Sequence, residues 1–295
     1  MLVDYHMHLE LDSDPGPCPY HLERLRVYCE HARAAGVDEI AITEHCNRFE
    51  EFRPAMQHLC TGSAEQSNFI RRSFRERLAP YVETLQAARA AGLPVKTSIE
   101  VDFIPGREAE IRAALADYPW DFLLGSVHFL GDWGLDMDPA AWTSVDVDAV
   151  YQRYFDELER AARSGLFDVL AHPDLPKVFG RRPSAGFDLQ GCFERIAQAA
   201  AECNLAIEIS TAGLRKPVGE LYPAPAFLPA CAERGVPVTL ASDAHEPEFI
   251  GADYDRAVAF AREHGIERVA VFEGRTRRLE PLGRARWQRS GGARP

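Results

Sequence analysis

The sequence lacks the features of several protein classes. It contains no apolar run near the roughly 20 residues of a membrane span, and it reaches Asp4 and His6 before any apolar run, which predicts that no signal peptide is present. The net charge of −12 argues against a nucleic-acid binder with a broad basic surface. The seven cysteines include no CxxC pair. We therefore expect neither a disulfide framework nor a thiolate zinc site, but free thiols in a reducing cytoplasm.

The fingerprint GxGxxG is also missing after the first strand-like segment, which argues against a doubly wound open sheet. Strand-like and helix-like segments alternate along the chain. Glycine stops and apolar β-branched runs predict helices at 20–35, 67–91, 107–117, 147–164, 187–203, 224–234 and 252–264. After the N-terminal strand, further strands are predicted at 37–43, 95–99, 120–124, 167–171, 206–209, 236–240 and 268–272. Seven or eight such units without a linker predict a closed parallel α/β barrel.

The organisation changes near the C-terminus, where the chain becomes rich in arginine from about Gly274. We expect a single barrel domain over residues 1–273 and an arginine-rich extension over 274–295, partly disordered, whose last dozen residues form a frayed tail. A nucleic-acid-binding arm is the weaker alternative for this extension.

Two histidines, His6 and His8, follow the first strand with one residue between them. Alternate side chains of an extended strand point the same way, so both imidazoles can reach one metal ion. Taken alone, the pair fits solvated surface histidines better than it fits a metal site.

The same chemistry recurs after almost every predicted strand. The metal-type residues at these ends are His6, His8, Glu44, His45, Glu100, His128, His172, Asp243 and His245. In a parallel barrel these ends open onto one face, and imidazole with carboxylate suits divalent metals. The set exceeds the needs of one tetrahedral ion, so we expect two or three ions with Glu100 as a bridge. Clustered metals suit phosphoester hydrolysis.

Cationic side chains follow two of these ends, where a phosphate would lie: Lys177, Arg181, Arg182, Arg215 and Lys216. Ordinary surface charge is the alternative. We favour Arg215 and Lys177 as phosphate ligands because loops on this face of a barrel commonly bind phosphate.

The chain resembles the polymerase-and-histidinol-phosphatase (PHP) superfamily, and within it the stand-alone histidinol-phosphate phosphatases. The matching pieces lie between residues 4 and 245: DYHMH, ITEH, SIEVDF, GSVHFLG, AARSGLFDVLAHPDLPKVFG, STAGLRKP, YPAP and SDAH. The resemblance implies a distorted, TIM-like (β/α)7 barrel with metals at the C-terminal ends of its strands.

The resemblance also implies how three metals would be held. Metal one takes His6, His8, Glu100 and Asp243, metal two shares Glu100 and takes His128 and His172, and metal three takes His45 and His245. The family often has a further histidine shortly after the HxH motif, whereas Asp14, or alternatively Asp12, occupies the matching spacing here. An oxygen ligand favours manganese or iron(II) over zinc at that position.

The function implied is a phosphomonoesterase that releases L-histidinol and phosphate from L-histidinol phosphate in histidine biosynthesis. Arg215, Lys177 and Arg181 would contact the phosphate, and Asp243 or His245 would assist the departing alkoxide. Acids such as Glu10, Asp12 or Asp102 would orient the ammonium and imidazole of this small-molecule partner. We expect no nucleic-acid or membrane partner and leave a homodimer open. The alternatives are a phosphoesterase for nucleotides or oligonucleotides and a non-catalytic metal-binding module.

Overall fold

The structure is a computed structural model of the chain, and it describes residues 1–11 and 20–283. Within that part the α-helices are α1 (Leu22–Ala34), α2 (Arg53–Met56), α3 (Ala64–Arg72), α4 (Leu78–Ala90), α5 (Glu108–Leu115), α6 (Val147–Arg163), α7 (Leu189–Glu202), α8 (Leu228–Glu233) and α9 (Tyr254–Glu263). The strands are β1 (Val3–Asp4), β2 (Glu39–Ile42), β3 (Val95–Thr97), β4 (Glu100–Asp102), β5 (Leu124–Ser126), β6 (Phe129–Leu130), β7 (Trp133–Gly134), β8 (Val169–Leu170), β9 (Ala206–Ser210), β10 (Val238–Ala241), β11 (Arg268–Glu273) and β12 (Thr276–Pro281).

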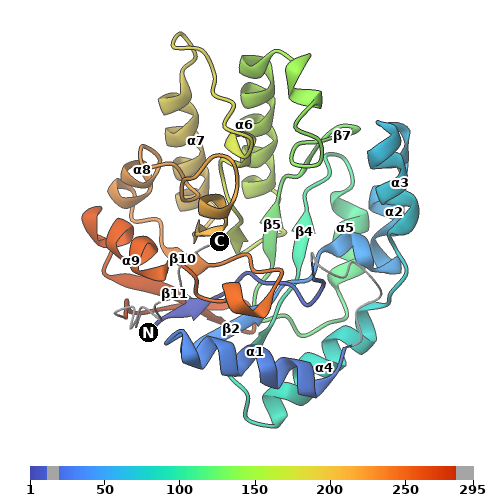
Figure 1. Cartoon of the computed structure of the whole chain (residues 1–295), viewed down its shortest axis with the longest axis vertical. Coiled ribbons are helices and arrows are strands. Elements are labelled where there is room, and N and C mark those ends of the chain that lie inside the picture. Colours follow the sequence, from blue (N-terminus) through green and yellow to red (C-terminus); the bar gives the residue numbers. More distant parts are fainter. Residues whose placement is uncertain (12–19, 284–295) are drawn as a thin grey trace, which may run out of the picture.

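The strands form two main sheets, with helices arranged around them (Figure 1). One sheet has the order β1-β2-β3, and the other has the order β12-β11-β10-β9-β8-β5-β4. Neighbouring strands run parallel except β12, which is antiparallel to β11. Two isolated parallel bridges join the sheets, Met7 with Ala244 and His45 with Glu100. The fold is therefore α/β with parallel sheets, as predicted.

The parallel strands are buried on both faces, which explains their continuous apolar character. Every residue of β9 and β10 is buried. Between the strands, the ring of Tyr5 stacks on Phe122 at 5.0 Å, and Phe122 packs on Phe272 at 5.2 Å. Residues far apart in sequence thus share one interior, which fixes the strand ends relative to one another.

The two longest helices, α6 and α7, begin where side chains satisfy their first N–H groups. The carboxylate of Asp146 accepts a hydrogen bond from Ala149 N at 3.2 Å before α6, and Asp188 accepts one from Gly191 N at 2.9 Å before α7. Such caps typically stabilise a helix by about 1 kcal/mol.

Some predicted boundaries differ from the structure. The single helix predicted over 67–91 is divided into α3 and α4, because Phe74 adopts a left-handed φ of 59° and its N–H donates to Asn47 O at 2.8 Å. The strand predicted at 120–124 lies later, at β5, and the stretch before the helix predicted at 147–164, where no element is predicted, contains the β6–β7 hairpin. Backbone pairing to another segment overrides local sequence preference in these places.

The start of the arginine-rich extension is part of the sheet, since β12 pairs with β11 along its whole length. The predicted frayed tail lies outside the described residues. No helix in the described part of the chain is long and apolar enough to cross a membrane. The six cysteines found there, which exclude Cys18, are all free.

Candidate metal centre

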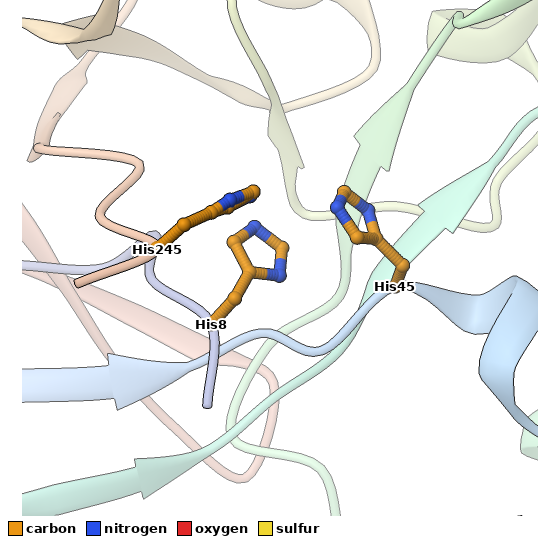
Figure 2. A group of neighbouring side chains, drawn as sticks. All are labelled: His8, His45 and His245. Atoms are coloured by element: carbon orange, nitrogen blue, oxygen red, sulfur yellow. The ribbon is translucent and has the colours of Figure 1, made fainter. Parts of the chain in front are cut away.

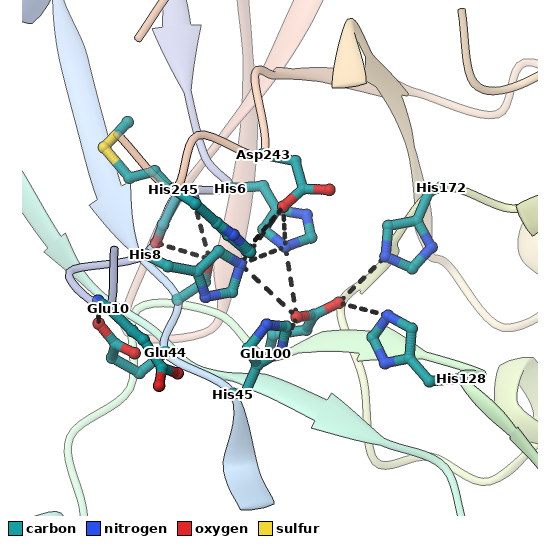
Figure 3. A network of polar contacts seen from close by, with 12 residues as sticks. His6, His8, Glu10, Glu44, His45, Glu100, His128, His172, Asp243 and His245 are labelled. Carbon is teal, nitrogen blue, oxygen red and sulfur yellow. Dashed lines mark hydrogen bonds and ion pairs between the residues drawn. The ribbon is translucent and has the colours of Figure 1, made fainter. Parts of the chain in front are cut away.

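The predicted metal-type residues come together where the parallel strands end (Figure 3). His6 and His8 follow β1, His45 follows β2, Glu100 begins β4, His128 follows β5, His172 follows β8, and Asp243 and His245 follow β10. Two of these residues, His172 and Asp243, have left-handed backbone φ values of 25° and 51°. Strained conformations of non-glycine residues are typical of functional sites, where the surrounding structure holds them in place.

Four donor atoms form the first group: His6 Nε2, His8 Nε2, Glu100 Oε2 and Asp243 Oδ1. The two imidazole nitrogens are 3.1 Å apart. The carboxylate oxygens of Glu100 and Asp243 lie 3.4 and 3.6 Å from His6, and 3.7 and 3.4 Å from His8. Metal–ligand bonds of about 2.0–2.2 Å in a tetrahedral site place neighbouring donors about 3.4 Å apart. These five separations therefore match those between ligands of a tetrahedral divalent ion.

The other carboxylate oxygen of Glu100 faces a second group. Glu100 Oε1 lies 3.1 Å from His172 Nε2 and 3.5 Å from His128 Nε2. Figure 3 shows Glu100 between these two rings on one side and His6 and His8 on the other. The two oxygens of one buried carboxylate are thus divided between two groups, which is the arrangement a bridging ligand requires.

A third group contains His8, His45 and His245, drawn in Figure 2, each of which offers a ligand atom within 4.8 Å of the others. The ring of His8 lies 4.1 Å from that of His45 and 4.3 Å from that of His245, measured between centroids. His8 Nδ1 is buried and has no hydrogen-bond partner among the described residues. His8 therefore belongs to both the first and the third group, whereas the sequence placed it in one. Asp14 and Asp12 lie outside the described residues.

Two carboxylates that do not face a metal group orient the histidines. Glu208, in β9, accepts a hydrogen bond from His6 Nδ1 at 2.9 Å, and its other oxygen accepts one from His172 N at 3.1 Å. Asp102 lies 2.8 Å from His128 Nδ1. Carboxylates in this position fix the ring and leave Nε2 as the ligand atom. Glu208 is not among the residues predicted from the sequence, although a single acid in the apolar strand AIEIS is a visible signal.

The electrostatics of the centre keep its carboxylates anionic. Burial would raise the pKa of Glu100, but His6, His128 and His45 hold that pKa well below its usual value. Burial would likewise raise the pKa of Asp243, and His6 and His8 hold it well below its usual value. Burial and the neighbouring His45 hold the pKa of His8 well below its usual value, so this imidazole is neutral. Ionised carboxylates and neutral imidazoles are the forms that bind metals.

The predicted phosphate cations lie in different surroundings. Lys177 is almost fully buried, 2.7 Å from Asp174 Oδ2, and donates to Leu221 O. The guanidinium of Arg215 donates to the backbone carbonyls of Ser242 and Asp243. Arg181 is exposed and lines neither of the cavities described below.

Two cavities open on the centre. The larger, of about 390 Å³, is lined by Glu10, Leu11, His45, Asn47, Glu65, Phe69, Arg72, Asp102, His128, Phe129, Asp136, Met137 and His245. The smaller, of about 140 Å³, is lined by candidate metal ligands and by Lys216, Tyr222 and Asp136 among others. Lys216, which the sequence ranked below Arg215, is the cation that faces this smaller cavity.

Comparison with known proteins shows the family of this chain. A family model described as PHP domain matches residues 4–212. A protein of Deinococcus radiodurans described as "Probable histidinol-phosphatase" is 35% identical over 286 residues, which cover 95% of this chain and 99% of the relative.

Solved structures share the fold at lower identity. A histidinol phosphate phosphatase from Lactococcus lactis, complexed with zinc, L-histidinol and phosphate, superposes with a TM-score of 0.69 at 20% identity and covers 94% of this chain and 98% of that one. A putative histidinol phosphatase from Listeria monocytogenes gives a TM-score of 0.70 at 20% identity and covers 86% of this chain and 99% of its own. At 20% identity these structures show that the fold is shared, and no more than the fold.

Proposed function

Because this chain belongs to the PHP domain family, we propose that it is a metal-dependent phosphatase that hydrolyses L-histidinol phosphate to L-histidinol and phosphate. The relative that is 35% identical over nearly both whole chains supports the reaction. The observation that carries the proposal is Glu100, a buried carboxylate whose two oxygens are divided between two groups of histidines. Paired metals of this kind are used in phosphate ester hydrolysis.

We propose that the centre holds two to three divalent ions, manganese, iron or zinc. His6, His8, Glu100 and Asp243 would hold the first ion, and Glu100, His128 and His172 the second. His45 and His245 would hold a third ion with His8 or, as the sequence predicts, with Asp14. The match between the first group's spacing and tetrahedral geometry supports this assignment.

We also infer that the two parallel sheets belong to one distorted (β/α)7 barrel and that the single domain predicted over residues 1–273 extends to include β12. The bridges Met7–Ala244 and His45–Glu100 support closure, because they connect the sheets at two places. The small-molecule substrate is the partner proposed here. Location in the cytoplasm, a homodimeric state and the lack of nucleic-acid partners remain predictions.

The residues of the chain have distinct tasks in the proposed reaction. When bound, divalent ions supply water activation and neutralise phosphoryl charge. Glu208 and Asp102 hold His6 and His128 so that Nε2 faces the centre. Water attacks phosphorus, the ester P–O bond breaks, and the departing oxygen takes a proton. The two predicted donors of that proton, Asp243 and His245, both line the smaller cavity. Because Asp243 stays ionised, we assign delivery of the proton to His245.

Release of phosphate from L-histidinol phosphate, measured beside nucleoside monophosphates and short oligonucleotides, tests the proposal. Metal content is determined on the same samples. We expect selective turnover of L-histidinol phosphate that a chelator abolishes. Turnover confined to nucleotides or oligonucleotides, or activity in fully metal-free protein, would contradict it.

A further inference from the structure

The two cavities at the candidate metal centre adjoin one another. Four side chains line both: His45, His128, Asp136 and His245. A substrate that reacts at the centre therefore has two different compartments available, one on each side of these residues. Their contrasting chemistry indicates which half of the substrate each one takes.

The smaller cavity suits the phosphoryl group. Its volume is about 140 Å³, and Lys216 contributes a positive charge to its lining. Tyr222, which is 2% exposed, also lines it, and its hydroxyl is buried without a hydrogen-bond partner among the described residues. A buried, unpaired hydroxyl is costly unless a ligand accepts its hydrogen bond. A phosphoryl oxygen is such an acceptor.

The larger cavity has an acidic lining. Two of its acids are already engaged, since Glu10 pairs with Arg48 and Asp102 accepts a hydrogen bond from His128 Nδ1. Glu65 and Asp136 have no ion-pair partner within residues 1–11 and 20–283. The one cation in this lining is Arg72. Two free carboxylates against one guanidinium favour a ligand that carries positive charge.

The fold explains why these acids face the cavity. Glu65, Phe69 and Arg72 lie on one face of α3, at spacings of four and three residues. Asp136 is held beside His128, because Leu135 N donates to His128 O at 2.8 Å. Acids from two separate elements thus converge on a single cavity.

The other walls are apolar and suit a flat ring. Phe69, Phe129 and Met137 all contribute to the lining. Aromatic faces and thioethers pack well against planar groups, and an aromatic face also attracts cations. The cavity of about 390 Å³ lies within the size range of small-molecule sites.

We propose that Glu65 and Asp136 are specificity-determining residues that bind the positively charged alcohol half of the substrate in the larger cavity, while its phosphoryl group occupies the smaller one. This inference rests on the proposed phosphatase function and deepens it. It assigns the ammonium to the two carboxylates and the ring to the wall of Phe69, Phe129 and Met137.

The test compares two phosphomonoesters of similar size, L-histidinol phosphate and 2-phenylethyl phosphate, whose alcohol half is uncharged. The measured quantity is kcat/KM for L-histidinol phosphate divided by kcat/KM for 2-phenylethyl phosphate. It is determined for the metal-loaded wild type and for Glu65→Gln, Asp136→Asn and Glu65→Lys. Losing one charge-assisted contact should lower the ratio about ten-fold, and charge reversal should lower it further. Glu263→Gln is the matched control, because Glu263 is exposed on α9 and lines neither cavity.

Metal content and thermal melting of each variant show whether the fold and the centre are intact. A ratio that falls in the three variants and not in Glu263→Gln supports the assignment. If wild type hydrolyses L-histidinol phosphate selectively and intact variants keep its ratio, the cavity assignment is overturned and the proposed function stands. If wild type hydrolyses neither monoester, both are overturned.

Discussion

Two buried clusters of acids lie side by side in this molecule, and they are neutralised in different ways. One surrounds Glu100 at the candidate metal centre, and the other surrounds Arg48, which pairs with Glu10, Glu44 and Glu76. The clusters adjoin because Glu44, which pairs with Arg48, and His45, which lies beside Glu100, are neighbours in sequence. Figure 3 draws Glu10 and Glu44 on one side of His45 and Glu100 on the other.

The two clusters differ in whether a side chain of the protein supplies the neutralising cation. Arg48 is 6% exposed and supplies a permanent charge within its cluster. There Glu44 also accepts the backbone N–H groups of Leu9 and Glu10, and so fixes the segment that follows His8. No arginine or lysine within the described residues pairs with the carboxylate of Glu100 or Asp243. A buried carboxylate without a permanent partner is costly, so this cluster is built to receive a cation.

The largest expected effect is on Glu100. Glu100→Gln keeps the size of the side chain but removes the charge that two groups of histidines share, so at least two metals should lose occupancy. Turnover of L-histidinol phosphate should fall at least about a thousand-fold, as expected for a site whose metal chemistry is lost. Elemental analysis and phosphate release measure the two effects.

Glu44→Gln is the matched control in the neighbouring cluster. It alters a buried carboxylate one residue from His45, and we expect lower stability with metal content retained. If Glu100→Gln kept its metals while Glu44→Gln lost them, the contrast between the two clusters would be incorrect.

Arg48→Met should produce the next largest effect, on folding. It leaves three carboxylates without their shared counterion, and breaking a buried pair typically costs about 3–5 kcal/mol. Denaturant unfolding should show this loss in metal-loaded and in chelator-treated protein alike, because the metals do not neutralise this cluster. A loss that appears in only one of the two states would mean that the clusters are energetically coupled.

Glu208→Gln should have a smaller effect, confined to the metal centre. The amide can still accept from one donor but carries no charge for His6, and removing such a partner typically weakens metal affinity about 10–100-fold. Competition with a fluorescent chelator measures the affinity, and saturating metal should restore activity. An unchanged affinity would show that Glu208 serves only packing.

The convergence of the candidate metal ligands was predictable because one regularity of parallel α/β folds places them. His6, His128 and Asp243 are separated by more than a hundred residues, yet each follows a strand, and parallel strands end on one face. The division of Glu100 between two groups was also anticipated from its place among the strands. Such positions depend on topology rather than on side-chain detail.

Partnerships between side chains were not predictable in the same way. Lys177 and Arg215 both follow strand ends, but the structure engages Lys177 with Asp174 and Arg215 with the carbonyls of the Asp243 turn. Glu208 was overlooked because its partners, His6 and His172, lie 202 and 36 residues away. Which cation is left for substrate depends on long-range packing, which local patterns do not encode.

The smallest expected effect concerns which of two neighbouring cations, Lys216 or Arg215, binds the phosphate of the substrate. Lys216 lines the smaller cavity, whereas the neighbouring Arg215 donates to Ser242 O and Asp243 O. Lys216→Ala should therefore raise KM for L-histidinol phosphate about ten-fold with metal content and melting temperature unchanged, as for one lost charge-assisted hydrogen bond.

Arg215→Ala should instead lower metal retention, because the turn that carries Asp243 loses its support. Steady-state kinetics and elemental analysis on both variants separate the two roles. If Lys216→Ala is near normal and Arg215→Ala raises KM at full metal content, the arginine is the phosphate ligand, as the sequence alone predicted.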